Sequence, residues 1–229
     1  AFYNEDCYVY IPDPNFEQAL IDESLDFGAI NKYVDTGNID LLTTLVVSNK
    51  GIYDLTGIQR FRALTALDCS SNALTDVDFS QNTNLEILYC GSNQLTSLDT
   101  SANTDLRDLR CQSNELISLD LSNNSQLQLL LCAVNNLSGL STVNNSLLTV
   151  LNCSFNQLTA INITANTSLI GLECSNNQLN SLNTSSNVSL STLYATDNQI
   201  SSMNLSSNTA LSDLRLTNNS FNDLNLSSN

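Results

Sequence analysis

Residues 64–84, LTALDCSSNALTDVDFSQNTN, are followed directly by residues 85–105, LEILYCGSNQLTSLDTSANTD, with the same residue types at corresponding places. This 21-residue period continues to residue 229, giving eight units in register, and a looser 22-residue unit from Leu42 precedes them. A fixed short period is typical of solenoids, in which each unit forms one turn and stacks on its neighbours. Besides leucines, the repeat contains two columns of asparagine, at Asn72, Asn93, Asn114, Asn135, Asn156, Asn177, Asn198 and Asn219, and at Asn82, Asn103, Asn124, Asn145, Asn166, Asn187, Asn208 and Asn229.

Each unit contains two similar halves. The first reads L-x-x-L-x-C-x-x-N, as in Leu64 to Asn72, and the second reads L-x-x-L-D-L-x-x-N, as in Leu116 to Asn124. Apolar residues two positions apart are the period of a strand with one buried face, so each half predicts a short strand. We expect the asparagines to satisfy buried backbone groups in the loop that follows each strand.

The motif resembles a family of repeats. It is similar to LxxLxCxxNxLxxLDLxxN, the 21-residue nested consensus of the bacterial leucine-rich repeats called IRREKO, over residues 42–229. The resemblance implies a leucine-rich-repeat solenoid, a flattened right-handed coil with parallel β-strands on both sides. The chain departs from the motif where Thr142 and Val143 shift an apolar column by one, and where Ala195 and Leu216 replace cysteine.

The first 41 residues do not repeat. Asp13 and Pro14 are an N-cap residue and a proline at the first helical position, and Phe16, Leu20 and Ile21 then share one helix face. We therefore expect a helical N-terminal cap over 1–41, followed by the solenoid over 42–229 with an incomplete last unit. The segment 8–64 resembles the front end of internalin-like bacterial proteins, which implies a secreted or cell-surface location.

The cysteines follow the repeat. Six of the seven, Cys69, Cys90, Cys111, Cys132, Cys153 and Cys174, are 21 residues apart, and Cys7 stands alone. Side chains on successive turns point in parallel, whereas a disulfide needs them turned toward each other and zinc needs converging ligands. We predict a ladder of buried free thiols, with an occasional bridge as the alternative.

Composition excludes several functions. With 23 acidic and 7 basic residues the net charge is -16, which argues against binding nucleic acid or an anionic membrane. The sequence contains no apolar run of membrane-spanning length. The chain has no histidine and no glycine-rich phosphate loop, so ordinary Ser–His and Cys–His pairs are absent. We expect no catalysis and no cofactor.

One column of acids offers a possible metal site. Asp78, Asp99 and Asp120 occupy successive turns, where carboxylate oxygens could take calcium. The favoured hypothesis is that each carboxylate accepts hydrogen bonds from the neighbouring turn, because later units have serine or asparagine there. We therefore predict no metal site.

Recognition in a solenoid uses the exposed positions that vary between turns. The apolar residues among these positions cluster in the fourth and fifth units, which is typical of a protein-binding surface. The alternatives are that a loop, a missing terminal segment or a second copy of the chain covers them. The predicted ligand-binding residues of the first-strand face are Ile87, Tyr89, Arg110, Leu129, Leu131, Val134, Val150, Asn152, Phe155, Glu173 and Tyr194.

The leading hypothesis for function is a non-catalytic protein-binding or adhesion module. It takes a protein partner on the first-strand face, leaves self-association open, and includes neither nucleic acid nor membrane insertion. The alternative is a carbohydrate-binding solenoid, with Tyr89 and Tyr194 stacking on sugar rings. A third idea is binding to ice or another crystal surface through the regular serines of the second strand, such as Ser101 and Ser122.

Overall fold

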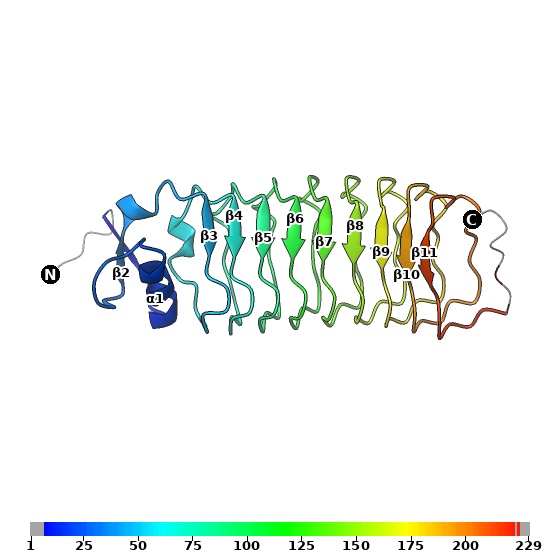
Figure 1. Ribbon diagram of the computed structural model, residues 1–229, viewed down its shortest axis with the longest axis horizontal. Coiled ribbons are helices and arrows are strands. Elements are labelled where there is room, and N and C mark those ends of the chain that lie inside the picture. Colours follow the sequence, from blue (N-terminus) through cyan, green and yellow to red (C-terminus); the bar gives the residue numbers. More distant parts are fainter. Residues whose placement is uncertain (1–6, 223, 225–229) are drawn as a thin grey trace.

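The computed structural model describes residues 7–222 and 224, and it shows an elongated rod with a helical cap at one end (Figure 1). Nine strands lie side by side along the rod, one for each turn (Figure 1). The predicted leucine-rich-repeat solenoid is therefore confirmed. Asn229, the last member of the second asparagine column, lies outside the described residues.

The first halves of the repeats form one parallel sheet in which every strand pairs with the next in chain order. Equivalent residues of successive repeats are partners, as Leu130 is of Leu109 and Leu151. The middle residue of each strand points into the core because side chains alternate along a strand. The strands are β3 (Thr44–Val46), β4 (Ala66–Asp68), β5 (Ile87–Tyr89), β6 (Asp108–Arg110), β7 (Leu129–Leu131), β8 (Val150–Asn152), β9 (Gly171–Glu173), β10 (Thr192–Tyr194) and β11 (Asp213–Arg215).

The second halves do not form the second sheet that the sequence predicts. Over residues 7–222, this side has only a single isolated parallel bridge, between Ser141 and Asn162. Here the side chain of the Asp or Asn residue accepts a hydrogen bond from the backbone two positions on, as Asp99 Oδ1 does from Ser101 N at 2.8 Å. Such local turns compete with pairing between strands. The prediction of strands on both sides is corrected to a sheet on one side only.

The first asparagine column lies just beyond the C-terminal ends of the strands. Asn135 is buried; its Oδ1 accepts from Leu116 N at 3.0 Å, and its Nδ2 donates to Cys111 O and Cys132 O at 3.1 Å each. One side chain thus joins two turns: it pairs the buried amide of Leu116, and it gives Cys111 O and Cys132 O a second donor besides Asn114 and Asn156. The same arrangement recurs in other turns, including those of Asn114 and Asn156.

The second asparagine column has two states, which alternate from Asn103 to Asn208. Its Nδ2 groups donate to backbone carbonyls of the preceding turn, as Asn166 does to Thr142 O and Asn145 O. The Oδ1 of Asn166 also accepts from Thr142 Oγ1 at 2.7 Å, whereas the Oδ1 of Asn145 is buried without a partner among the described residues. The difference follows the residue 24 positions earlier, which is Thr142 for Asn166 but Leu121 for Asn145.

Replacing Thr142 with valine should lower the free energy of unfolding by about 1–3 kcal/mol, because it leaves the Oδ1 of Asn166 buried without a donor. Valine keeps the volume of threonine, so packing changes little. Urea unfolding measures the effect, with the exposed Thr96→Val as the control. Equal stabilities for Thr142→Val and the unsubstituted chain would contradict a stabilising role for this hydrogen bond.

The N-terminal cap is a helix packed with a two-stranded sheet. β1 (Tyr8–Tyr10) pairs antiparallel with β2 (Tyr33–Asp35), and α1 (Pro14–Asp22) lies between them in sequence. Two 3-10 turns, η1 (Thr36–Asn38) and η2 (Ile58–Arg60), complete this end. The helix begins where Asp13 and Pro14 predict, while the strand pair was not expected from the sequence.

Asp13 fixes the cap to the first turn of the solenoid. Its Oδ1 accepts from Asn15 N and Phe16 N at the start of α1. Its Oδ2 accepts from Tyr53 N at 2.7 Å and Asp54 N at 2.9 Å. The carboxylate is fully buried, so these four bonds compensate for the loss of solvation.

Gly57 permits the close approach of the cap to this turn. Its φ is +105°, and a Cβ atom there would lie 2.3 Å from Ile11 Cδ1 and 2.9 Å from Tyr10 O. No other residue type fits this position without displacing β1.

Candidate functional site

The outward-facing residues of β3–β11 form two rows that cross the strands. The first row contains the residue before each buried centre, and the second row contains the residue after it. The strand register places equivalent positions next to each other, so residues distant in sequence become neighbours. All eleven predicted site residues lie on this face: Ile87, Leu129 and Val150 in the first row; Tyr89, Arg110, Leu131, Asn152, Glu173 and Tyr194 in the second; and Val134 and Phe155 just beyond the strands.

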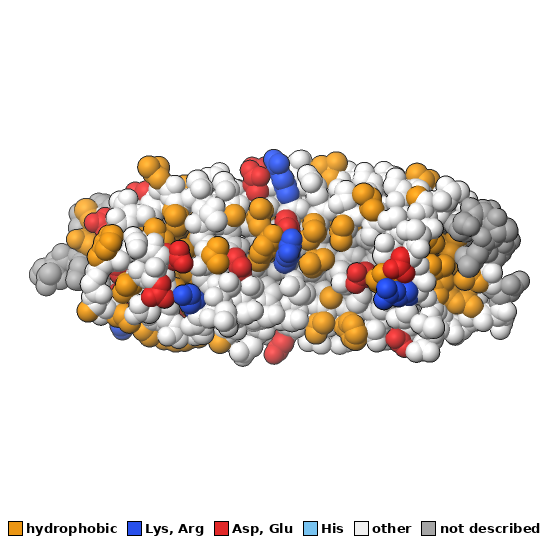
Figure 2. All heavy atoms as spheres, viewed as in Figure 1, with side chains coloured by type: hydrophobic (Ala, Val, Ile, Leu, Met, Phe, Trp, Pro, Cys, Tyr) orange, Lys and Arg blue, Asp and Glu red, His pale blue; other side chains and the backbone are white. Residues whose placement is uncertain are grey.

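An exposed apolar patch occupies the middle of the face, formed by Leu129, Leu131, Val134, Val150 and Phe155. The three strand residues are half-buried, while Val134 is 49% and Phe155 is 56% exposed. Figure 2 shows hydrophobic side chains gathered over β7 and β8, with acidic and basic side chains on either side. No segment of residues 7–222 covers the patch.

Val134 and Phe155 also have an unfavourable backbone conformation. Their φ angles are +57° and +54°, in the left-handed region. The same position in other turns contains serine, asparagine or aspartate, such as Ser113 and Asn176. Left-handed backbone is rare for β-branched and bulky residues and costs roughly 1–2 kcal/mol per residue. Neither side chain is needed for the core, so their presence at this strained, exposed position favours a role in binding.

Tyr89, Asp108 and Arg110 form a cluster beside the patch. Tyr89 Oη donates to Asp108 Oδ2 at 3.0 Å, and Arg110 Nε and Nη2 donate to the two Asp108 oxygens at 3.1 and 2.9 Å. The Arg110 guanidinium also lies over the Tyr89 ring, 4.3 Å from its centre. Partial burial and the hydrogen bond to Asp108 raise the pKa of Tyr89, and the same carboxylate raises the pKa of Arg110.

The cluster is repeated 105 residues, or five turns, later. Tyr194 Oη donates to Asp213 Oδ2, Arg215 Nη2 donates to the same oxygen at 3.4 Å, and the guanidinium lies 4.1 Å from the Tyr194 ring centre. The hydrogen bond to Asp213 raises the pKa of Tyr194 and, reciprocally, lowers that of Asp213. At a strand spacing of about 4.8 Å, the two clusters are roughly 24 Å apart.

Sequence reasoning found only part of these clusters. Tyr89, Arg110 and Tyr194 were among the predicted site residues, but Asp108, Asp213 and Arg215 were not. The spacing of 105 residues is the signal that identifies them. Between the clusters, Asn152 and Glu173 are joined by a hydrogen bond of 2.8 Å from Asn152 Nδ2 to Glu173 Oε2.

The acidic column on the opposite side does not gather ligands for a metal. The described residues contain no group of three acidic, cysteine or histidine side chains placed to hold an ion. Asp78, Asp99 and Asp120 each accept a backbone hydrogen bond from a serine two positions on in their own turn. Of the three, Asp78 alone also has the expected hydrogen bond from the neighbouring turn, from the Gln59 side chain. Hydrogen bonds from these serines lower the pKa of all three carboxyls.

The cysteine ladder is buried, with all six thiols free, and Cys7 is free and exposed. Burial raises the pKa of Cys69, Cys111 and Cys153 to about 12, and those of Cys90, Cys132 and Cys174 well above the ordinary value. Neutral, inaccessible thiols do not act as nucleophiles. The ladder contributes to the core rather than to a reactive site.

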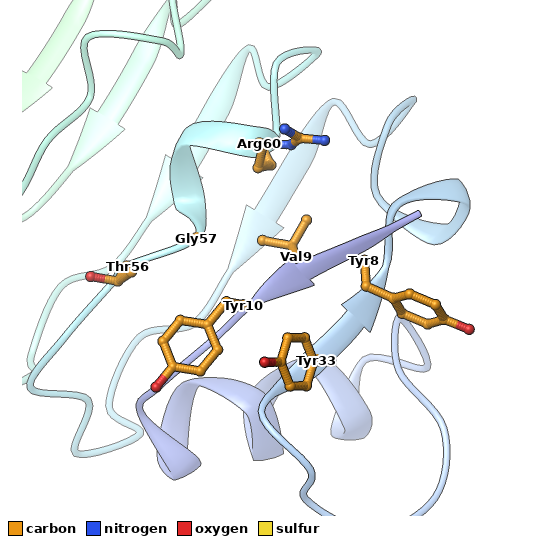
Figure 3. Close-up of a pocket in the computed structure, with 7 residues that line it drawn as sticks. All are labelled: Tyr8, Val9, Tyr10, Tyr33, Thr56, Gly57 and Arg60. Atoms are coloured by element: carbon orange, nitrogen blue, oxygen red, sulfur yellow. The ribbon is translucent and has the colours of Figure 1, made fainter. Parts of the chain in front are cut away.

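A hollow of about 500 Å³ lies at the cap, between the β1–β2 pair and η2 (Figure 3). The rings of Tyr10 and Tyr33 lie on its wall, with centres 5.6 Å apart. Sequence reasoning did not anticipate this hollow, because its walls come from segments that meet only in the fold. It is lined by Tyr8, Val9, Tyr10, Tyr33, Thr56, Gly57 and Arg60.

Comparison with solved structures supports the fold. The functional domain of InlJ from Listeria monocytogenes, which includes a cysteine ladder, superposes with a TM-score of 0.91 at 34% identity. The match covers 96% of this chain and 50% of that one, so this chain spans half the length of that domain. Internalin C2 of the same organism matches with a TM-score of 0.75 at 23% identity, over 94% of this chain and 95% of the other.

A plant protein has a similar solenoid. The leucine-rich-repeat ectodomain of the receptor kinase GASSHO1/SCHENGEN3 from Arabidopsis thaliana, in complex with CASPARIAN STRIP INTEGRITY FACTOR 2, matches with a TM-score of 0.71 at 25% identity. That match covers 82% of this chain and 25% of the ectodomain. No family model and no curated protein matches the chain. Across the described residues, no helix has the length and apolar character needed to cross a membrane.

Proposed function

We propose that this leucine-rich-repeat solenoid, whose fold is internalin-like, is a non-catalytic protein-binding or adhesion module of a secreted or cell-surface bacterial protein. The partner binds the first-strand face through the predicted site residues, with the apolar patch at its centre. The observation that carries the proposal is the pair Val134 and Phe155, which are exposed and held in left-handed backbone. Tyrosine and arginine, which flank the patch, are the residue types that dominate binding energy in protein interfaces.

The double variant Val134→Asn, Phe155→Asn tests this function without weakening the fold. Asparagine is native to this column at Asn176 and Asn218 and tolerates left-handed backbone. We expect the free energy of unfolding to rise by about 1–3 kcal/mol, since two strained residues are relieved. Urea unfolding checks this part of the prediction, and a loss of stability would show that the two side chains support the core.

Binding is measured in a pull-down from host or sister-cell surface extract, followed by titration of the captured and identified protein. The double variant should lose the captured protein, whereas Val143→Ser, Val188→Ser should keep it. This control removes two exposed apolar side chains away from the strands. Unchanged affinity of the asparagine variant for the captured protein would refute a binding role for the patch.

The carbohydrate alternative gains support from the cap rather than from the sheet. Arg110 and Arg215 already cover one face of the Tyr89 and Tyr194 rings. The hollow beside Tyr10 and Tyr33 instead offers aromatic and polar groups around a space that fits a small sugar. A glycan array probed with the unsubstituted chain and with Tyr10→Ala separates this function from protein binding.

A further inference from the structure

We infer that the sheet face is self-complementary and pairs two copies of this chain, face to face and antiparallel, about a two-fold axis that runs along the strands between β7 and β8. The inference rests on the proposed function, because it uses the same face. A dimer covers the apolar patch, so dimerisation would control the access of another partner to it. It rests on the order of charged, aromatic and apolar residues along the two rows.

A two-fold axis in this position matches each strand from β4 to β11 with one strand of the other copy. It places β7 on β8, β6 on β9, β5 on β10 and β4 on β11, and it lays each row on the same row of the partner copy. Contacts of this kind occur twice in the interface, as in all isologous dimers. A surface suits such an interface only if its sequence is complementary to itself when read backwards.

The second row meets this requirement. From β4 to β11 it reads Asp68, Tyr89, Arg110, Leu131, Asn152, Glu173, Tyr194, Arg215. Read against its reverse, Asp68 faces Arg215, Arg110 faces Glu173, Tyr89 faces Tyr194, and Leu131 faces Asn152 at the centre. Every charged residue of the row therefore faces the opposite charge, and each of these pairs occurs twice.

The first row is compatible with the same axis. Leu129 faces Val150 at the centre, so the apolar patches of the two copies cover each other. Asp108 faces Gly171, which has no side chain to obstruct it, and Ile87 faces Thr192. No like charges oppose each other in either row.

Other axes do not give this match. An axis along the rod would reverse the strand direction and lay each row on the other row, so that Arg110 would face Asp108, but Asp68 would face Ala66 and Glu173 would face Gly171. Two carboxylates would then lack a partner of opposite charge. Moving the chosen axis by half a strand spacing, onto β8, would place Arg110 against Tyr194 and Leu131 against Glu173, which removes the ion pairs and exposes the patch to a charge. Only the axis between β7 and β8 places every charged residue of the second row opposite the opposite charge, so charge complementarity favours this register.

The clusters already hold these side chains in place. Arg110 is fixed by two hydrogen bonds to Asp108 and by the Tyr89 ring, and Glu173 accepts a hydrogen bond from Asn152. Immobilised side chains lose less conformational freedom on association. Three of the five N–H groups of Arg110 remain for a carboxylate of the other copy.

The size of the face sets the strength of the dimer. Eight strands at about 4.8 Å, with about five residues across at 3.3 Å each, give roughly 600 Å² per copy. Two copies then bury roughly 1,200 Å², which is the lower limit for a specific interface. The net charge of -16 opposes association at long range, but at about 0.15 M salt this repulsion is screened beyond about 8 Å. A weak, reversible dimer is therefore expected.

Sedimentation equilibrium at this ionic strength, with protein from about 10 μM to about 1 mM, tests the inference in the concentration range of a small interface. Arg110→Glu and Glu173→Arg should each weaken dimerisation by at least about tenfold, since each places like charges together twice. The double variant Arg110→Glu, Glu173→Arg should restore it. Arg62→Glu, which makes the same charge change in the exposed connection before β4, should leave it unchanged.

Two results overturn the inference: a chain that stays monomeric at every concentration, and a double variant that dimerises no better than the single ones. Circular dichroism of each variant shows whether it is folded, and an unfolded single variant is replaced by Asp68→Arg, which breaks the pair with Arg215. A monomeric chain leaves the proposed function intact, because a foreign partner does not need a self-complementary face. Conversely, a confirmed dimer without any captured partner rejects the binding function alone.

Discussion

Raising the pH from about 8 to about 10 should reduce the free energy of unfolding by an amount on the order of 10 kcal/mol. The six thiols of the cysteine ladder are buried and remain protonated in the folded chain, where the pKa of Cys69, Cys111 and Cys153 is about 12. In the unfolded chain they ionise near pH 8.5. A raised folded pKa contributes stability that is fully present below the unfolded pKa and is lost as the pH rises toward the folded value.

Each thiol loses about 1–2 kcal/mol by pH 10, and six act in parallel. The sum approaches the whole stability of an ordinary domain, about 5–15 kcal/mol. Urea unfolding under reducing conditions at three pH values between 8 and 10 measures the slope. We expect the chain to unfold cooperatively in this window without denaturant or with little of it.

The double variant Cys132→Ala, Cys153→Ala is the matched control, because Ala195 occupies the same column naturally. It should be less stable at pH 8 as a result of the lost volume, yet lose only about two thirds as much stability on going to pH 10. The comparison between the two slopes cancels the titration of the tyrosines. An unfolding midpoint that does not move between pH 8 and 10 would show that the thiols are accessible to solvent.

Replacing Asn135 with alanine should destabilise the chain by about 2–6 kcal/mol. The change removes one acceptor and two donor contacts at once. It leaves Leu116 N buried without a partner, while Cys111 O and Cys132 O each keep one hydrogen bond, from Asn114 and Asn156. The unpaired amide costs roughly 1–3 kcal/mol, and each lost carbonyl hydrogen bond costs about 0.5–1.5 kcal/mol. The effect is much larger than that expected for deleting one exposed amide.

The neighbouring Asn136 provides the control, since it is exposed and lies outside the first asparagine column. Asn136→Ala should change the stability by less than about 0.5 kcal/mol. Urea unfolding of both variants at pH 7 gives the comparison. If the two variants proved equally stable, the first asparagine column would be a by-product of the repeat and would not stabilise the fold.

The sequence by itself determined the number and length of the turns, the buried columns and the start of the cap helix. These features follow from a fixed period and from local capping chemistry, as at Asp13 and Pro14, which do not depend on distant residues. It also placed all eleven predicted site residues on one face, because equal spacing puts equivalent residues of neighbouring turns in one row.

Only the tertiary structure decided which side chains meet. The spacing puts Tyr89, Asp108 and Arg110 on adjacent turns, but their hydrogen bonds depend on the rotamers that packing allows. Likewise, Oδ2 of Asp13 accepts hydrogen bonds from Tyr53 N and Asp54 N, which lie 40 and 41 residues away in the sequence. The second sheet failed to form because the short polar side chain of Asp99 binds its own backbone at Ser101. A pattern of apolar residues records which face is buried, and it does not record whether a backbone N–H pairs with the next turn or with a nearby carboxylate.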